Sequence, residues 1–272
     1  MTESILDRIS EIFYQLSDAE RRVANGVMND PARAQYLSIT ELSELAGVGD
    51  ATVSRFCRRL GFSGFYAFKL ELAKALTEKT EERAVGSNIG AVLSDATAAL
   101  NATAQVLSED TVLRAAEMIC GAERVLCAGA GGSLLIAAEC AHLFSTVSPK
   151  FFAVPDTHMQ LITLSSMKAD DVLLLVSYSG ATKSGLELIG YAKKCGIKTV
   201  LLTGFARSPL GKVADEVLCC AAQEGPYQSG SIPARIAQLL AVDALFRAYC
   251  NRNETANERA KCVAEALSDQ HL

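Results

Sequence analysis

The chain has 272 residues, of which 50% are hydrophobic, and a formal net charge of −5. This length allows two domains of roughly 100–200 residues each, and the hydrophobic content excludes an intrinsically disordered chain. The negative charge disfavours a protein that coats nucleic acid through bulk charge, but it permits a local basic face. The N-terminus has no secretory signal pattern, and no apolar run approaches about 18 residues, so we expect a cytoplasmic protein that does not enter membranes.

The nine cysteines and three histidines predict neither a metal site nor a disulfide framework. No two cysteines form a C-x-x-C pair, and no histidine stands at ligand spacing from a cysteine or another histidine. Most of the cysteines lie in apolar stretches, where we expect buried thiols in a reducing compartment. We therefore expect no metal and no cofactor.

Helical patterns alone occupy residues 1–77, which we interpret as the first domain. Ile5, Ile9 and Ile12 recur on one helical face, and a second pattern covers residues 19–28. An Asn-Asp-Pro sequence at 29–31 ends that helix, because the residue before a proline avoids the helical conformation. Another helix is expected from about residue 65 to residue 76.

A helix-turn-helix is predicted between residues 38 and 60. Its first helix opens with a capping box, Ser38 to Glu41, in which the serine and glutamate side chains satisfy free N–H groups. Leu42 and Leu45 are expected to face inward. The sequence Ala-Gly-Val at 46–48 supplies a small residue, a glycine for positive φ and an apolar plug, which together favour the turn.

The second helix, about residues 51–60, has the two faces of a DNA-reading helix. Either Gly49 or Asp50 caps it. The core positions at i, i+3 and i+7 spacing are Val53, Phe56 and Leu60. The predicted DNA-facing residues are Ala51, Thr52, Ser54, Arg55, Arg58 and Arg59.

The charge near this helix is local. Residues 51–74 hold five basic residues, Lys69 among them, against one acidic residue, whereas residues 1–77 hold nine basic and ten acidic residues. We expect the short side chains and Arg55 to meet base edges, and Arg58 and Arg59 to meet phosphates, with Lys69 as a further DNA contact. The alternative from spacing alone is a plain three-helix bundle with a solvated basic face.

The sequence around the turn resembles the DNA-binding half of the RpiR family of bacterial transcriptional regulators. The resemblance rests on residues 37–65, LSITELSELAGVGDATVSRFCRRLGFSGF, and it extends upstream through residues 16–24 and downstream to Leu76. It implies DNA binding by the first domain. The chain departs from the family at Gly49, where a serine is usual, so either Asp50 takes over the cap or a phosphate contact is lost.

Residues 78–106 are interpreted as a linker and a connecting helix. Residues 78–83 are polar and mostly charged, and Gly-Ser-Asn follows at 86–88. Amphipathic helices are expected at about 89–107 and 110–119.

Short apolar runs alternate with helical patterns in the third segment, residues 107–272. Strands that are apolar throughout and separated by helices indicate a parallel sheet covered on both faces. A long helix or pair of helices is expected at 232–250. The predicted strands are 125–128, 151–154, 172–176, 199–202 and 216–219.

Two loops at strand ends have the composition of a phosphate cradle. Residues 177–184 read Ser-Tyr-Ser-Gly-Ala-Thr-Lys-Ser and lead into a helix from 185 to 195, so hydroxyls and free N–H groups meet at a helix N-terminus. Residues 129–133 read Gly-Ala-Gly-Gly-Ser. Leu134 breaks the full dinucleotide pattern, although Asp156 keeps a nucleotide alternative open; a serine-rich turn is the other alternative.

Over about residues 107–250 this segment resembles the sugar isomerase (SIS) domain, which RpiR-type regulators carry after their helix-turn-helix. The resemblance implies a parallel sheet flanked by helices and a bound phosphosugar. Residues 231–239 resemble the closing helix of that domain, but Ala234 stands where a serine often precedes the arginine, here Arg235. The implied phosphosugar contacts are Gly131, Ser133, Ser177, Ser179, Gly180, Ala181, Thr182 and Glu224.

Together these features predict a transcriptional regulator of sugar metabolism genes whose operator affinity is controlled by a phosphosugar. We expect a homodimer or homotetramer, paired through helices near 89–119 and 232–250, on a roughly palindromic operator. The alternative is an SIS-type phosphosugar isomerase, which needs a positioned base. Glu224 and His158 are the candidates, but neither has an obvious second catalytic group, so we predict a sensor without catalytic residues.

Overall fold

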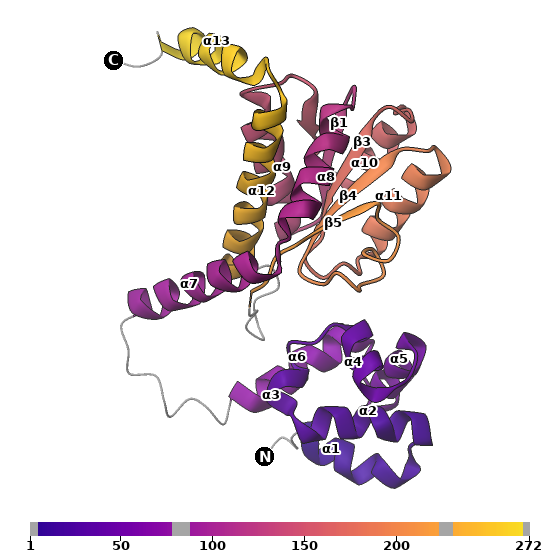
Figure 1. Ribbon diagram of the computed structural model, residues 1–272. Coiled ribbons are helices and arrows are strands. Elements are labelled where there is room, and N and C mark those ends of the chain that lie inside the picture. The colour runs from indigo at the N-terminus through magenta and orange to yellow at the C-terminus, as the bar shows by residue number, and fades with distance from the viewer. Residues whose placement is uncertain (1–4, 78–87, 223–230, 269–272) are drawn as a thin grey trace. The chain divides into compact units, whose positions relative to one another are not determined.

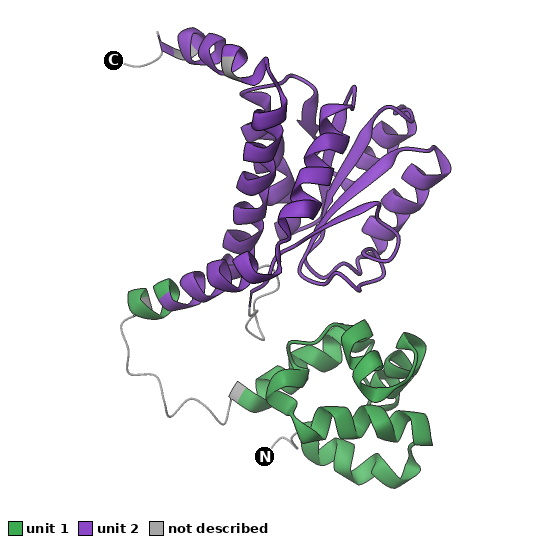
Figure 2. Cartoon of the chain, in the orientation of Figure 1, with its two compact units in different colours: residues 1–93, 223–231 green, residues 94–222, 232–272 purple. Residues whose placement is uncertain are grey.

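The structure is a computed structural model that describes residues 5–77, 88–222 and 231–268. The chain folds into two compact units, one within residues 1–93 and the other made of residues 94–222 and 232–272 (Figure 2). The boundary falls inside helix α7, Asn88–Val106. The predicted polar linker at 78–83 lies outside the described residues.

The first unit is helical, as its sequence predicts (Figure 1). Its centre is a cluster of buried apolar residues contributed by α1, α2, α4, α5 and α6, including Ile9, Val23, Leu42, Phe56 and Phe68. Phe56 and Phe68 pack edge to face with their ring centroids 5.6 Å apart. The elements are α1 (Ile5–Ile12), a 3-10 turn η1 (Phe13–Gln15), α2 (Asp18–Asn29), α3 (Pro31–Ala34), α4 (Ile39–Ala46), α5 (Asp50–Arg59) and α6 (Phe65–Thr77).

The second unit contains a five-stranded sheet in which every pair of neighbouring strands is parallel. The strand order is β2-β1-β3-β4-β5. β2 therefore lies on one side of β1, and β3, β4 and β5 follow in sequence on the other side of β1. The strands are β1 (Val125–Gly129), β2 (Phe151–Ala153), β3 (Val172–Val176), β4 (Lys198–Thr203) and β5 (Glu216–Cys219). The helices are α8 (Glu109–Cys120), α9 (Gly132–Ser145), α10 (Thr157–Ser165), α11 (Lys183–Lys194), α12 (Ile232–Arg252) and α13 (Ala256–Ser268), preceded by α7.

Helices cover both faces of this sheet (Figure 1). Alternate strand residues point to opposite faces: Val125 and Cys127 pack with α8, α9 and α12, while Leu126 and Ala128 pack with α10 and α11. All five residues of β1 and all five of β3 are buried, which explains why these strands are apolar throughout. The predicted fold class, a helical bundle followed by an α/β domain, is confirmed.

Two sequence predictions about the fold need correction, and one helix was not predicted. The expected helix at 232–250 is the single long helix α12, and the unpredicted helix α13 follows it. Leu45 is half exposed rather than inward-facing. The nine cysteines, all among the described residues, form no disulfide, but only four of them are buried, four are half-buried and Cys262 is exposed. Burial raises the pKa of Cys57 to about 12.

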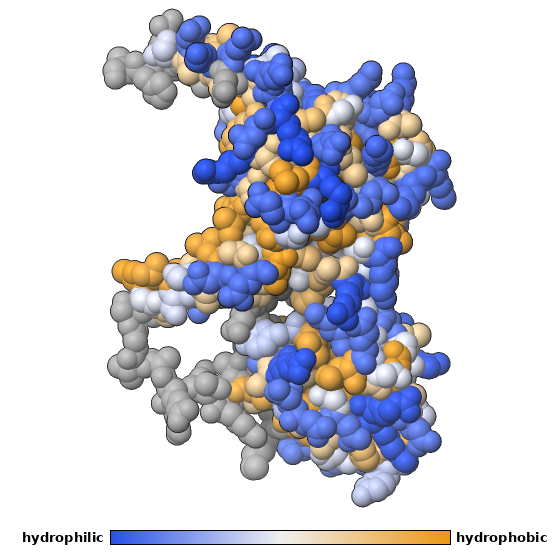
Figure 3. Space-filling model, viewed as in Figure 1, coloured by the Kyte–Doolittle hydropathy of each residue, from blue (hydrophilic) through white to orange (hydrophobic). Residues whose placement is uncertain are grey.

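No helix of the described ranges is long and apolar enough to cross a membrane. Polar side chains cover much of the visible surface, and apolar side chains gather on the exposed part of α7 (Figure 3). There Ile89, Val92 and Leu93 are 81%, 61% and 66% exposed.

Candidate functional site

The helix-turn-helix is formed by α4 and α5, joined by a turn that needs glycine. Gly47 ends α4 with φ of 62°, a left-handed conformation that residues with a side chain rarely adopt. Its N–H and that of Val48 close the helix end on backbone oxygens of α4. At the other end of α4 the predicted capping box is present: Ser38 Oγ accepts from the Glu41 N–H at 3.1 Å, and the Ser38 N–H donates to Glu41 Oε2 at 2.8 Å.

Asp50 does not cap the second helix. Gly49 is the N-cap residue and offers no side-chain hydrogen bond, while Asp50 is the first residue of α5. The Asp50 carboxylate instead accepts from Thr40 Oγ1 at 3.0 Å and from Ser43 Oγ at 2.5 Å. Asp50 therefore fixes α5 against α4, and its negative charge is turned toward two hydroxyl groups of the bundle.

The two faces of α5 agree with the prediction except at Thr52. Val53, Phe56 and Leu60 are buried, as is Cys57, and Ala51, Arg55 and Arg58 are exposed. Thr52 is only 8% exposed, and its Oγ1 accepts a hydrogen bond from Arg55 Nη2 at 3.1 Å. The Thr52 side chain thus supports Arg55 from below instead of standing on the outer face. Ser54 is half-buried.

Arg59 is tied to its own bundle. Its Nη2 donates to the Gln15 carbonyl oxygen at 2.7 Å, and its Nη1 lies 3.3 Å from Glu20 Oε2. Burial alone would raise the pKa of Glu20, but hydrogen bonds from Ser17 and the charges of Arg59 and Arg55 lower it below its usual value. The Arg58 side chain is exposed and makes no hydrogen bond to a described residue, so it is better placed than Arg59 to meet a phosphate.

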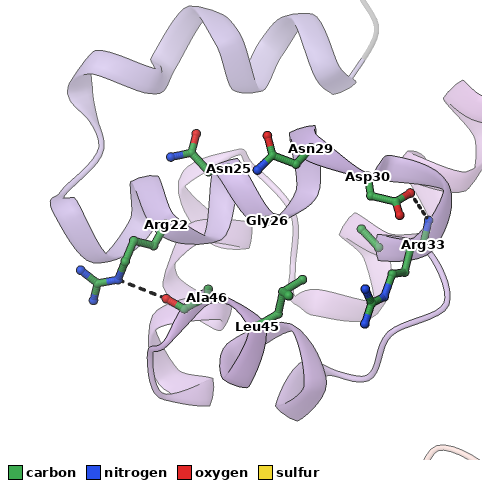
Figure 4. Close-up of a pocket in the computed structure, with 9 residues that line it drawn as sticks. Arg22, Asn25, Gly26, Asn29, Asp30, Arg33, Leu45 and Ala46 are labelled. Carbon is green, nitrogen blue, oxygen red and sulfur yellow. Dashed lines mark hydrogen bonds between the residues drawn. The ribbon is translucent and has the colours of Figure 1, made fainter.

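Lys69, the remaining predicted DNA contact, is half-buried on α6. A surface hollow of about 370 Å³ lies elsewhere in this unit, between α2, α3 and α4 (Figure 4). Leu45 lines this hollow next to Gly26, which has no side chain to cover it. Arg22 Nε donates to the carbonyl oxygen of Ala46, the last residue of α4, at 3.1 Å. The C-terminal end of α4 in this hollow is therefore already hydrogen-bonded to a side chain.

The two predicted phosphate loops lie side by side in the second unit. They follow β1 and β3, which are paired in register from Val125 and Val172 to Gly129 and Val176. β1 and β3 are also the strands at which the sheet order reverses direction, and ligands of open parallel sheets bind at the carboxyl ends of the strands beside such a point. The fold therefore brings both loops to the same edge of the sheet, side by side.

The first loop is shaped by glycines. A Cβ on Gly129 would lie 2.8 Å from the Ser133 backbone oxygen, so the loop can close only without a side chain there. Gly131 has φ of 56° and is the N-cap residue of α9, with no side-chain hydrogen bond at that helix start. Ser133 is half-buried in the first turn of α9.

Gln160 supports this first loop and was not predicted. It is fully buried on α10, and its Nε2 donates to the carbonyl oxygens of Gly129 (2.9 Å) and Val154 (2.8 Å), which joins the ends of β1 and β2. Its Oε1 is buried and accepts no hydrogen bond from a described residue. No sequence signal distinguishes this glutamine from any other helical glutamine. Asp156, the nucleotide candidate, instead caps α10 by accepting from the Met159 N–H at 2.8 Å.

The second loop is held by its own hydroxyls and by the loop after β4. Ser177 is buried with its Oγ 3.4 Å from Thr182 Oγ1, whereas Ser179 is exposed. Gly180 has φ of 60°, and a Cβ there would overlap the Ser208 side chain. Thr203 Oγ1 donates to the Tyr178 carbonyl oxygen at 3.1 Å. Contacts with Thr203 and Ser208 therefore fix the loop geometry, while Ser179 is exposed to solvent.

Not all backbone N–H groups of the second loop are open to a ligand. The Gly180 N–H donates to the Ser177 carbonyl oxygen at 3.0 Å, so Gly180 serves the loop through its conformation. The Ala181 N–H makes only a long contact, 3.4 Å, with Ser179 Oγ. Thr182 is the N-cap residue of α11 without a side-chain cap, and the first turn of α11 contains no acidic residue. The open donors are those of Ala181 and the first turn of α11.

The remaining candidates do not extend this cradle among the described residues. Glu224 lies outside the described ranges. His158 is exposed in the first turn of α10, without a hydrogen bond to a described carboxylate. In the same ranges no group of three or more His, Cys, Asp or Glu side chains could hold a metal ion.

Comparison with known proteins agrees with both halves of this description. The model of the helix-turn-helix domain, rpiR family, matches residues 3–79, and that of the SIS domain matches residues 118–248. The HTH-type transcriptional regulator TTE0211 of Caldanaerobacter subterraneus subsp. tengcongensis is 32% identical over 250 residues, which is 89% of each chain. HexR of Escherichia coli is 28% identical over 278 residues, covering 99% of this chain and 96% of HexR.

The fold comparison covers both units as well. The solved structure of Vibrio vulnificus NanR, complexed with ManNAc-6P, superposes with a TM-score of 0.90 at 27% identity and covers 98% of this chain and 99% of NanR. The order of the two domains, the identity to TTE0211 and the length of the match all agree, and the chain belongs to the rpiR family of helix-turn-helix transcriptional regulators.

Proposed function

We propose that this regulator binds an operator through α5 and that a phosphosugar bound at the carboxyl edge of the sheet controls its operator affinity. The observation that carries the proposal is the pair of neighbouring loops after β1 and β3, each of which leads into a helix without a side-chain cap. The complex of NanR with ManNAc-6P supports a phosphosugar as the effector.

In the proposed complex the phosphate group lies at the start of α11. Ser179 and Thr182 donate from their hydroxyls, and Ala181 and the first helical turn donate from the backbone, while buried Ser177 positions Thr182. Gly131 and Ser133 meet the sugar or the phosphate from the first loop, and Glu224 accepts from sugar hydroxyls. Gly180 keeps the loop in shape.

The effector site is tested by thermal shift of the full chain with a panel of sugar phosphates that begins with ManNAc-6P and includes hexose, pentose and amino-sugar phosphates. A panel member that binds the native state raises Tm. The Ser179→Ala variant should need about 10–100 times more of that compound, because a hydrogen bond to a charged group is lost. Ser165→Ala, an exposed serine at the end of α10, is the comparison variant. An unchanged response of Ser179→Ala would contradict the proposed phosphate position.

On the DNA side, the proposed reading face is Ala51, Ser54 and Arg55, with Arg58 on the backbone. Arg58→Ala should weaken binding to all sequences and reduce the salt dependence by about one phosphate contact. Arg33→Ala, an exposed arginine on α3, is the matched control and should leave binding unchanged. Equal effects of the two variants, measured by fluorescence anisotropy over a range of salt, would contradict the assignment of α5.

We further propose a homodimer that places two α5 helices on a palindromic operator. The exposed apolar residues of α7 and the exposed Ile232 and Leu239 of α12 support pairing through these helices. Light scattering of the full chain tests the dimer, and a monomer at micromolar concentration would contradict it.

We also propose that the second unit senses its sugar without converting it. Isomerisation needs a positioned base, and His158 is exposed with no hydrogen bond to a described carboxylate that would orient it. Incubation with each sugar phosphate of the panel, followed by product analysis, should give no turnover. Conversion at rates typical of enzymes, about 1–1000 per second, would overturn the sensor function.

A further inference from the structure

We infer that two hydroxyl groups, those of Tyr178 and Thr103, connect the second loop (residues 177–182, hereafter the effector loop) to helix α7 and transmit the effector signal toward the DNA-binding unit. The inference rests on the proposed function, because it assigns a route to the regulation proposed for that site. It concerns two positioning residues that do not themselves meet the sugar phosphate.

Tyr178 belongs to the effector loop, but its side chain leaves it. The residue stands between Ser177 and Ser179, and its hydroxyl reaches the segment after β5, where it donates to the Ala222 carbonyl oxygen at 2.7 Å and accepts from the Ala222 N–H at 3.0 Å. The ring packs edge to face on Phe205 at 5.9 Å. A Cβ on Gly204 would lie 2.9 Å from the Tyr178 ring, so that glycine lets the ring lie against the backbone. The ring is thus a rigid spacer between the loop and Ala222.

The Thr103 hydroxyl binds the backbone of Ala221, the residue before Ala222, in the same two-way manner. Its Oγ1 donates to the Ala221 carbonyl oxygen and accepts from the Ala221 N–H, both at 3.0 Å. The side chain of Thr103 is completely buried. Two consecutive residues past the end of β5 therefore have their backbone groups paired with side-chain hydroxyls, one from the effector loop and one from α7.

This contact is a principal anchor of α7. Among the residues of α7 whose side chains are described, only Ala99 and Thr103 are buried, and the rest of the helix is exposed or half-exposed. The Ala99 side chain is a single methyl group and can only pack. The hydrogen bonds that fix the orientation of the helix therefore come from Thr103. Toward its N-terminus, α7 leads along the chain to residues 78–87 and the helix-turn-helix unit.

The chain of contacts is therefore Ser177–Ser179, Tyr178 ring, Ala222, Ala221, Thr103 and α7. An anion that draws in the hydroxyls of the loop shifts the backbone of Tyr178. Because the ring is rigid, the shift moves Ala222 and Ala221 and changes the position or the hold of α7. Coupling of this kind requires that the effector favour one of two arrangements of these contacts.

The test measures coupling separately from binding. Operator fragments are selected from random DNA by the full-length protein, and the effector probe is the panel member, beginning with ManNAc-6P, that raises the Tm of the wild type most. The coupling factor is the ratio of operator Kd with and without that compound, and factors of about 5–150 are typical of allosteric proteins. The variants are Thr103→Val, Tyr178→Phe and the double variant, with Thr103→Ser to restore the hydroxyl and Thr97→Val, an exposed threonine on α7, as the matched control.

We expect Thr103→Val to bind the sugar phosphate within about twofold of the wild type, while its coupling factor falls at least about fivefold toward one. Thr103→Ser and Thr97→Val should keep the wild-type factor. Tyr178→Phe should lose coupling too, and the double variant should lose no more than the larger single loss, because both residues act on one segment. If Thr103→Val does not fold, Tyr178→Phe, which retains the packed ring, carries the test.

The outcomes separate the two proposals. If no panel member binds the wild type or alters its operator affinity, the proposed function fails and the inference fails with it. If the compound binds and regulates the wild type, but Thr103→Val and Tyr178→Phe keep the wild-type coupling factor, the function stands and the route is wrong. Loss of stability in these variants with an unchanged coupling factor would likewise assign the two hydroxyls a structural role only.

Discussion

The two ends of the five-stranded sheet carry opposite kinds of side chain. At the amino end, acidic residues beside the strand starts are paired with cations of the same unit: the pairs are Arg124–Asp171, Arg114–Glu216 and Lys193–Asp215, at 2.9, 2.6 and 3.4 Å. At the carboxyl end, the loops after β1 and β3 consist of glycines, alanines, hydroxyl residues and Tyr178, and Asp156 is used as a helix cap.

The difference teaches where a ligand can bind and where the unit obtains its stability. Charges that are matched internally gain little from an added ion, whereas uncharged donors at helix starts gain a full set of hydrogen bonds from an anion. Substitutions at the amino end should therefore lower stability without changing effector binding. Those at the carboxyl end should impair effector binding more than stability.

The largest expected effect is that of Gly180→Ala at the carboxyl end. The new Cβ would overlap the Ser208 side chain, and alanine rarely adopts the φ of 60° that Gly180 has, so the loop must change shape. We expect effector affinity to fall about 100-fold or more and the free energy of unfolding to fall by about 2–4 kcal/mol. Titration calorimetry and urea unfolding measure the two effects. The control is Gly190→Ala, on an exposed position of α11 with open space around it, which should be neutral or slightly stabilising.

Asp171→Asn should have the next largest effect, and on stability alone. The carboxylate accepts hydrogen bonds from the backbone N–H groups of Arg124 and Lys168 and from the Arg124 guanidinium, which an amide cannot all satisfy. The free energy of unfolding should fall by about 1–3 kcal/mol, with effector affinity within about twofold of the wild type. An effector defect as large as that of Gly180→Ala would break the distinction between the two ends.

Thr203→Val should have a smaller, mixed effect. The substitution removes the hydrogen bond to the Tyr178 carbonyl oxygen and the one that Thr203 Oγ1 accepts from the Phe205 N–H at 3.2 Å, but it keeps the side-chain volume. We expect about 1 kcal/mol of stability to be lost and effector affinity to fall about fivefold. Wild-type effector affinity in a folded Thr203→Val protein would show that the loop needs no support from β4.

Acid should have the smallest effect, one that is absent at neutral pH. Burial alone would raise the pKa of Asp171, but its hydrogen bonds and the charge of Arg124 lower that pKa below the ordinary value of 3.8. A carboxyl whose pKa is lower in the folded state stabilises the fold above its unfolded pKa, and that contribution is lost as the pH falls through the folded pKa. Urea unfolding below about pH 4 should show this loss in the wild type and a weaker one in Asp171→Asn.

The sequence predicted element positions best where apolar residues recur in a short run. Strands 172–176 and 216–219 were predicted with their observed bounds, because short, mostly apolar runs between helical patterns are typical of parallel strands. The first is buried throughout, whereas only Leu218 is buried in the second. The predicted exposures of Leu45 and Thr52 were wrong, because helical periodicity places a residue on one face of its helix without showing what packs against that face. Opposite Leu45 is Gly26, which leaves a hollow, and Thr52 is covered within the bundle.

Partners far apart in the chain could not be predicted. Thr103 and Ala221 are 118 positions apart, and Gln160 meets Gly129 across 31 positions. Such contacts involve ordinary helical residues whose role depends on a backbone group that only the fold brings near. Arg59 is a similar case: its spacing on α5 is that of a phosphate contact, but Glu20 and the Gln15 carbonyl oxygen already bind it.

The way the helices begin has a consequence for local opening of the native state. Ser17, Ser38 and Asp156 cap α2, α4 and α10 with their own side chains, whereas α5, α9 and α11 begin at Gly49, Gly131 and Thr182 without such a bond. Helix ends that lack caps fray more readily. In the unliganded protein the first-turn amides of α5, α9 and α11 should therefore exchange their hydrogens sooner than those of the capped helices. DNA should then slow exchange at α5 and a sugar phosphate should slow it at α9 and α11, so each ligand completes the helix that it contacts.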